Sequence, residues 1–171
     1  MKRDEIYLGN PNLKRANTTI EFTQEQILEF MACREDPVYF AQNHVKIVTL
    51  DKGLMPFEPY DFQQKLIENF HGNRFNICKM PRQTGKSTTV ISYLLHYLLF
   101  NDSVNIGILA NKAATARELL GRLQTAYENV PKWMQQGVLS WNRGSLELEN
   151  GSKILAASTS ASAVRGMSFN I

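Results

Sequence analysis

The sequence is poor in cysteine, with only Cys33 and Cys78 among its 171 residues. Neither belongs to a Cys-x-x-Cys pair or to a Cys/His cluster, so neither a disulfide framework nor a zinc site is indicated. We therefore expect two reduced, buried thiols in a cytosolic protein. The three histidines, His44, His71 and His96, are also isolated, and we interpret them as structural.

The sequence also lacks a long hydrophobic run and a strong excess of charge. Its longest apolar stretch, Val90–Phe100, is interrupted by Ser92 and His96 and is too short to cross a bilayer. The first ten residues carry charges that no apolar run follows, so we expect no signal peptide. A net charge of +3 and a pI near 8.9 permit a role on DNA without arguing for one.

Local signals predict alternating helices and strands after an extended or weakly ordered arm over residues 1–22. Thr23 and Gln26 form a capping box, and Asp36 followed by Pro37 begins a second helix. The predicted helices run from Thr23 to about Arg34, from Asp36 onward, and over Asp61–Phe70, Lys86–Phe100 and Ala113–Tyr127. The predicted strands are Val45–Leu50, Phe75–Met80, Val104–Ala110, Val138–Trp141, Leu146–Leu148 and Ile154–Ala157. The strand–helix–strand–helix order over residues 75–127 favours an α/β domain with a mostly parallel sheet.

The segment between Met80 and Ser87 carries the strongest chemical signal. Gly85-Lys86-Ser87 matches the second half of the phosphate-loop pattern G-x-x-x-x-G-K-[ST], between a predicted strand and a predicted helix. In such a loop, backbone N–H groups surround a phosphate, the lysine reaches the β- and γ-phosphates, and the hydroxyl coordinates Mg²⁺. The first glycine of the pattern is replaced by Met80. A helix that merely begins with Gly-Lys-Ser after a strand is the alternative.

The loop from Pro81 to Ser87 resembles the Walker A variant of large terminase subunits, most closely those of T-even-like tailed bacteriophages. That family tolerates the loss of the first glycine and carries an arginine early in the loop, which Arg82 matches. Further segments resemble family blocks in the same order along the chain. These segments are Asp36–Ile47, Pro56–Gln63, Gly107–Lys112, Trp141–Ser145 and Val164–Phe169.

This resemblance implies a P-loop NTPase fold of the RecA/helicase-like kind, with an incomplete parallel sheet and a small helical N-terminal subdomain. Residues 1–22 would be the arm, 23–55 the subdomain, and 56–171 the ATPase core, truncated before the Walker B strand. Lys86 and Arg82 would be catalytic, Ser87 would hold Mg²⁺ through its hydroxyl, and Arg82 would contact or sense the γ-phosphate. The implied ATP-binding residues are Phe62, Gln63, Pro81, Arg82, Gln83, Thr84, Gly85, Lys86, Ser87 and Thr88.

Several of these residues also have simpler interpretations. The resemblance implies that Phe62 stacks on the adenine and that Gln63 hydrogen-bonds to it, but Phe62 could instead be a core aromatic. Arg82 could be a solvated loop charge. Asn111 and Lys112 fit either a DNA or nucleotide contact or a plain helix cap, since they follow a predicted strand. Arg165 fits either a coupling role or a loop charge. Trp133 and Trp141 are interpreted as packing residues.

The resemblance also implies function and partners. The whole protein would couple ATP hydrolysis, with Mg²⁺, to translocation of double-stranded DNA into a phage capsid. Its partners would be the portal protein and the small terminase subunit, in an oligomeric ring formed only on the capsid, with no membrane association. It would act in the host cytoplasm and transiently at the procapsid portal, and would be absent from the mature virion. The alternatives are a non-catalytic nucleotide- or DNA-binding module and a helicase-like ATPase of another family.

One part of the family pattern is missing. Hydrolysis needs an acidic residue at the end of a second buried strand. In the family that strand, ending Asp-Glu, follows the Val164–Phe169 block, and this chain stops at Ile171. Glu147 and Glu149 are poor substitutes, and the C-terminal nuclease domain is absent. We therefore expect a fragment, inactive in hydrolysis by itself, whose Phe75–Met80 strand lacks its neighbours, or else a rearranged or swapped assembly.

Overall fold

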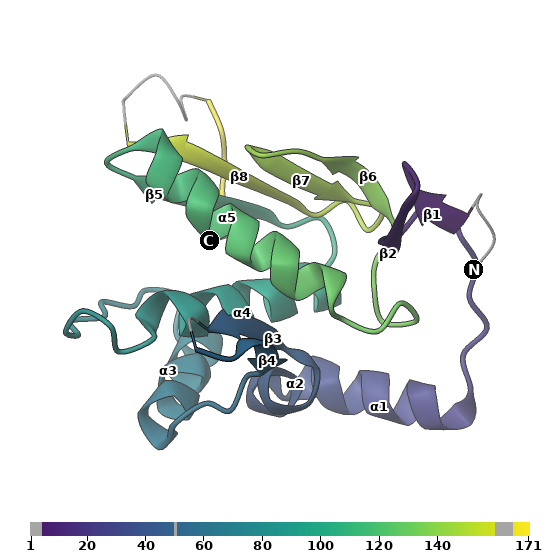
Figure 1. Ribbon diagram of the computed structural model, residues 1–171, viewed down its shortest axis with the longest axis horizontal. Coiled ribbons are helices and arrows are strands. Elements are labelled where there is room, and N and C mark those ends of the chain that lie inside the picture. Colours follow the sequence, from purple (N-terminus) through teal and green to yellow (C-terminus); the bar gives the residue numbers. More distant parts are fainter. Residues whose placement is uncertain (1–4, 50, 160–165) are drawn as a thin grey trace.

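The computed structural model describes residues 5–49, 51–159 and 166–171. Its helices are α1 (Gln24–Glu35), α2 (Pro37–His44), α3 (Asp61–Gly72), α4 (Lys86–Phe100) and α5 (Ala113–Glu128). Its strands are β1 (Ile6–Tyr7), β2 (Asn10–Lys14), β3 (Lys46–Thr49), β4 (Gly53–Pro56), β5 (Asn105–Ala110), β6 (Val138–Trp141), β7 (Ser145–Leu148) and β8 (Lys153–Ser158). Figure 1 shows a sheet covered by α5, with α4 beneath α5 and the three N-terminal helices beyond α4.

The two N-terminal helices begin where their caps predict. Thr23 Oγ1 accepts a hydrogen bond from Gln26 N (3.2 Å), while the Gln26 side chain accepts one from Thr23 N (3.0 Å). Asp36 Oδ1 accepts from Val38 N (2.8 Å) and from Tyr39 N. These bonds satisfy backbone N–H groups that have no partner within the helix. The capping box and the Asp36 cap of the sequence are therefore confirmed.

The long apolar helix α4 is the centre of the packing. It begins and ends at the predicted residues, Lys86 and Phe100, and most of its side chains after Thr88 are buried. α5 packs on one side of it, and α2 and α3 pack on other sides. A helix that is apolar around most of its circumference is stable only when surrounded in this way.

The central sheet is mixed, which corrects the prediction of a mostly parallel one. Its strand order is β5-β8-β7-β6, and only β5 and β8 run parallel. β7 pairs antiparallel with both β8 and β6. The turns between these strands, around residues 142–144 and 149–152, are too short for the crossover that a parallel pairing requires. The sequence already shows these short turns, and they predict antiparallel pairing of β6, β7 and β8 more strongly than the alternation of strands and helices predicts a parallel sheet.

The predicted strand Phe75–Met80 is wrong for this structure. These residues form an irregular segment, and the side chains of Phe75 and Ile77 are 85% and 99% exposed. An apolar sequence becomes a strand only when neighbouring strands pair with its backbone groups. Among the described residues this segment pairs with no strand, and the outer strand β5 bonds through Asn105 and Gly107 to Asn170 and Ile171 instead.

The N-terminal segment predicted as an extended arm contains a two-stranded hairpin, β1–β2. Leu13 is 1% exposed, and Lys14 N donates to the buried Gln135 side chain (3.1 Å). Lys14 Nζ also lies 3.0 Å from Glu149 Oε1. The hairpin is thereby fixed to the turn before β6 through Gln135 and to the turn between β7 and β8 through Glu149.

One hydrophobic core includes buried residues from all three predicted segments, such as Leu13, Phe40 and Leu120. Cys33 belongs to this core, and burial raises the pKa of its thiol to about 12. The second thiol corrects the sequence expectation: Cys78 is exposed, because it lies in the irregular segment 75–80. In the parts of the chain that the structure describes, no helix combines the length and the apolar character that a membrane span requires.

Candidate phosphate-binding site

The loop Pro81–Gly85 forms a tight turn immediately before α4. Gln83 and Gly85 have left-handed backbone conformations, with φ of 63° and 75°. Such a conformation is rare for a residue with a side chain, and is found mainly where the surrounding structure or a function requires it. Left-handed residues next to a helix start turn successive backbone N–H groups toward one point, and thereby form an anion-binding concavity.

Gly85 is required at its position for two reasons. Its positive φ strains any residue that has a Cβ atom, and a Cβ built there would clash with Nε2 of Gln63. The Gln63 side chain is 4% exposed and joins α3 to the loop. Its Oε1 accepts from Tyr60 N (2.9 Å), and its Nε2 donates to the carbonyl of Thr84 (3.4 Å).

The side chain of Lys86 lies folded into the loop. Its Nζ donates to the carbonyl oxygens of Met80 (3.1 Å) and Pro81 (2.7 Å). Thr84 Oγ1 donates to the same Pro81 carbonyl (3.1 Å). The loop therefore wraps around an ammonium group, which lies beside the start of the helix.

The N-terminus of α4 has no side-chain cap. The first N–H groups of a helix have no partner within it, and together with the helix dipole they attract an anion. Ser87 and Thr88 are the second and third residues of α4 and therefore lie in its uncapped first turn, where Ser87 is exposed and Thr88 is half-buried. Thr89 faces the other way, and its hydroxyl donates back to the Gly85 carbonyl (3.1 Å).

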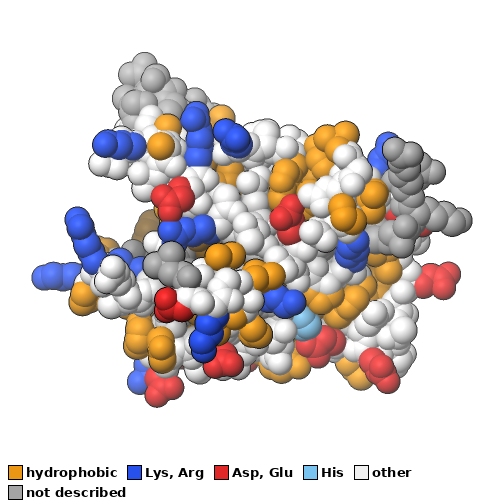
Figure 2. All heavy atoms as spheres, in the orientation of Figure 1, with side chains coloured by type: hydrophobic (Ala, Val, Ile, Leu, Met, Phe, Trp, Pro, Cys, Tyr) orange, Lys and Arg blue, Asp and Glu red, His pale blue; other side chains and the backbone are white. Residues whose placement is uncertain are grey.

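Basic side chains surround this end of the molecule. Figure 2 shows Lys and Arg gathered at the left edge, where Figure 1 places the segment before α4. Arg74, Lys79 and Arg82 are the exposed basic residues of that segment. Their positive charge reinforces the attraction of the helix N-terminus for anions.

Two aromatic rings lie at the start of α3, next to the loop-binding Gln63. Tyr60 and Phe62 stack with ring centroids 5.8 Å apart and an interplanar angle of 12°. Phe62 is 45% exposed, which rules out the interpretation of this residue as a core aromatic. Sequence reasoning missed Tyr60, although the sequence shows an aromatic residue two positions before Phe62, and the structure shows that it is exposed.

The remaining candidate residues lie elsewhere. Lys112 is the N-terminal flanking residue of α5 and makes no side-chain cap, and Asn111 is exposed beside it. Arg165 lies outside the described residues. Trp133 and Trp141 pack against the core, as predicted.

Two comparisons with known proteins show the family and the fold of this chain. The sequence profile of the family described as "Terminase large subunit, T4likevirus-type, N-terminal" matches residues 77–171, which is more than half of the chain. The chain therefore belongs to the large terminase subunits, as an N-terminal portion of the T4-like type. The match includes the loop, α4 and every strand of the mixed sheet.

The fold is similar to a solved structure, the crystal structure of the HK97 bacteriophage large terminase. The TM-score is 0.63 at 20% sequence identity, over 79% of this chain. The similarity covers 29% of that terminase, so this chain spans less than a third of its length. At this identity the likeness concerns the fold alone.

Proposed function

We propose that this chain is the ATP-binding segment of a DNA-packaging terminase large subunit, with a P-loop NTPase fold. One observation carries the proposal: the Pro81–Gly85 loop places Lys86 and an uncapped helix N-terminus side by side, within a family of large terminase subunits. Backbone N–H donors, a dipole and an ammonium group at one point suit a polyphosphate.

The residues present fit ATP and Mg²⁺. The first turn of α4, which no side chain caps, leaves its backbone N–H groups available to phosphate oxygens. Lys86 would exchange its two loop carbonyls for the β- and γ-phosphates, and the Ser87 hydroxyl would hold Mg²⁺. Arg82, exposed on the loop, would pair with the γ-phosphate. ATP, when bound, would supply the phosphoanhydride bond whose hydrolysis drives the motor.

The remaining predicted residues surround these groups. Pro81, Gln83, Thr84 and Thr88 would line the phosphates. Phe62, stacked on Tyr60, would carry the adenine on its exposed face. The side-chain amide of Gln63 already bonds to Tyr60 N through its oxygen and to the Thr84 carbonyl through its nitrogen. A hydrogen bond to adenine would therefore use the second lone pair of that oxygen or the second N–H of that nitrogen.

Hydrolysis requires a carboxylate near Mg²⁺, and the two glutamates of the sheet are engaged elsewhere. Glu147 pairs with Lys153 (2.7 Å), and Glu149 pairs with Lys14 while accepting hydrogen bonds from Asn17 N and Gly137 N. We therefore expect residues 1–171 by themselves to bind ATP without turning it over. This favours the non-catalytic binding module as the second candidate.

The partners of the whole protein follow from the family as proposals. They are double-stranded DNA, the portal protein and the small terminase subunit, with an oligomeric ring assembled on the capsid. The working location would be the host cytoplasm and the procapsid portal. A helicase-like ATPase of another family is disfavoured by the terminase match over residues 77–171.

Calorimetric titration of the chain with Mg-ATP tests the proposal. Lys86→Ala should weaken binding by about 10- to 150-fold, since a hydrogen bond to a charged group contributes about 1.5–3 kcal/mol. Lys52→Ala is the control and should leave the affinity unchanged, since it also removes one lysine charge but from an exposed turn between β3 and β4. Equal affinity of wild type and Lys86→Ala would overturn the proposal. In a phosphate-release assay, residues 1–171 by themselves should show no turnover, and measured turnover would exclude the non-catalytic binding module.

A further inference from the structure

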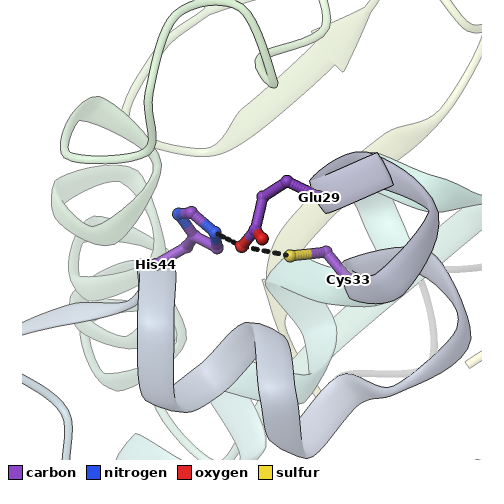
Figure 3. Close-up of side chains that lie close together, drawn as sticks. All are labelled: Glu29, Cys33 and His44. Atoms are coloured by element: carbon purple, nitrogen blue, oxygen red, sulfur yellow. Dashed lines mark hydrogen bonds and ion pairs between the residues drawn. The ribbon is translucent and has the colours of Figure 1, made fainter. Parts of the chain in front are cut away.

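Three side chains with metal-binding atoms meet where α1 and α2 pack together (Figure 3). Glu29 and Cys33 are one turn apart on α1, so both point from the same face of that helix. His44 is the last residue of α2. One ligand atom from each residue lies within 4.8 Å of the other two.

The carboxylate occupies the centre of this cluster. Glu29 Oε1 lies 2.6 Å from His44 Nε2 and 3.7 Å from Cys33 Sγ. The second oxygen, Oε2, accepts a hydrogen bond from the Tyr39 hydroxyl (3.0 Å). A hydroxyl that orients a ligating carboxylate in this way is a common feature of the outer sphere of metal sites.

The cluster has a closed side and an open side. Cys33 is fully buried, the side chain of His44 is 13% exposed, and that of Glu29 is 31% exposed. An ion can therefore approach past the carboxylate, while the core shields the sulfur. An ion held here would take its further ligand, a water molecule, from the exposed side of the carboxylate.

The geometry does not suit a cysteine nucleophile. In such a site the imidazole contacts the thiol and removes its proton, and the carboxylate orients the imidazole from behind. Here the hydrogen bond of Cys33 goes to the carboxylate, which lies between the thiol and the imidazole. The three ligand atoms lie within 4.8 Å of one another, as the ligands of one ion do.

We propose that Glu29, Cys33 and His44 bind a single divalent transition-metal ion of borderline softness, Zn²⁺ in the first place, with water as the fourth ligand. One thiolate, one imidazole and one carboxylate form a donor set typical of this ion. On binding, the Cys33 thiol loses its proton to solvent. His44 binds through Nε2 as the neutral tautomer that carries its proton on Nδ1.

The distances require an adjustment of up to about 1.3 Å, since Cys33 Sγ and His44 Nε2 lie within 4.8 Å of each other. With Zn–S of about 2.3 Å and Zn–N and Zn–O of about 2.0 Å, a tetrahedral site has ligand separations of about 3.3–3.5 Å. The Sγ–Oε1 distance of 3.7 Å is already close to this. The Nε2–Oε1 distance of 2.6 Å must open by about 0.7 Å. The half-exposed Glu29 side chain can rotate by that amount without disturbing the core.

The ion would link three helices. Its ligands fix α1 to α2, and the backbone carbonyl of Cys33 accepts a hydrogen bond from His96 Nε2 of α4 (2.8 Å). The site lies apart from the loop that begins α4, so the inference stands independently of the proposed function.

Titration of chelator-treated chain with Co²⁺, followed by absorption, tests the site. Wild type should bind one Co²⁺ and show a thiolate-to-cobalt charge-transfer band that added Zn²⁺ removes. Cys33→Ser should lose this band, and Cys78→Ser, which removes the exposed thiol, should keep it. The absence of the band in wild type, or its persistence in Cys33→Ser, would overturn the proposal.

A second variant keeps the test decisive if Cys33→Ser fails to fold, which circular dichroism would reveal. His44→Gln should bind Zn²⁺ at least about tenfold more weakly than wild type in a competition titration with a chromophoric chelator. The same substitution at the exposed His71 should leave the affinity unchanged. Equal affinity of His44→Gln and wild type would count against the site.

Discussion

The two ends of α4 differ in almost every property, although they belong to one uninterrupted helix. At the N-terminal end, Lys86, Ser87 and Thr88 are exposed or half-buried, and no side chain caps the backbone. At the C-terminal end, from Leu94 to Phe100, all side chains except that of Tyr97 are buried. The buried C-terminal half of α4 therefore stabilises the helix, while its exposed N-terminal end is available to bind a ligand.

A substitution at the buried end of α4 should change the free energy of unfolding, and one at the exposed end should change the affinity for ATP. The loss of stability at the buried end is the largest effect that we expect. Leu95→Ala removes a fully buried side chain and should lower the free energy of unfolding by about 3 kcal/mol. Ser87→Ala at the exposed end should change it by less than about 0.5 kcal/mol while weakening Mg-ATP binding. Urea denaturation and calorimetry measure the two quantities. Similar losses of stability in both variants would contradict the comparison.

Replacing a glycine by alanine should have opposite effects on stability in the loop before α4 and in the interior of α5. Gly85→Ala should destabilise the chain by at least about 1–2 kcal/mol, because its φ is left-handed and its Cβ would clash with Gln63. Gly121 lies inside α5, where an added Cβ meets no atom within 4 Å. Gly121→Ala should therefore stabilise the chain by up to about 1 kcal/mol. Thermal unfolding of both variants shows whether the signs are opposite.

Adjacent glutamines on α3 allow a smaller and more specific comparison. Gln63→Ala removes the side chain that holds the Thr84 carbonyl, and Gln64→Ala removes a hydrogen bond to the Pro59 carbonyl (3.0 Å). Each should cost about 1 kcal/mol of stability. Only Gln63→Ala should also weaken ATP binding, by about fivefold, since only Gln63 positions the loop. Equal ATP affinity of the two variants would show that Gln63 does not position it.

The smallest effect on stability is expected at Arg82, which is exposed on the loop. Arg82→Ala should leave the free energy of unfolding within about 0.5 kcal/mol of wild type. It should weaken ATP binding about tenfold and leave ADP binding unchanged, because the proposed contact is to the γ-phosphate. Parallel titrations with both nucleotides test this. An equal loss of affinity for ADP would show that Arg82 contacts a part of the nucleotide other than the γ-phosphate.

Local signals predicted the helices of this chain well, because caps and apolar periodicity act within a few residues. The capping box at Thr23, the Asp36 cap and both ends of α4 lie where the sequence indicates. The strand prediction for Phe75–Met80 failed for the opposite reason. Whether an apolar segment becomes a strand depends on partners that are distant in the sequence.

The tight loop before α4 was predictable because its residues, from Pro81 to Ser87, are contiguous in sequence, and its role in phosphate binding stays a prediction. The contacts of Gln63 with Thr84 and of Lys86 with the loop carbonyls could not be predicted, since they depend on how the loop folds. The cluster of Glu29, Cys33 and His44 was missed altogether. Its members are spread over two helices, and its spacing matches no common Cys/His pattern.

The attachment of the β1–β2 hairpin has a consequence for the order of folding. Lys14 N bonds to Gln135, a residue 121 positions away, and this contact closes a loop that includes every helix. Closing so long a loop is entropically costly until the helices between have packed. We therefore expect the hairpin to dock last during refolding, and its backbone amides to be protected from hydrogen exchange only after those of α4 and α5.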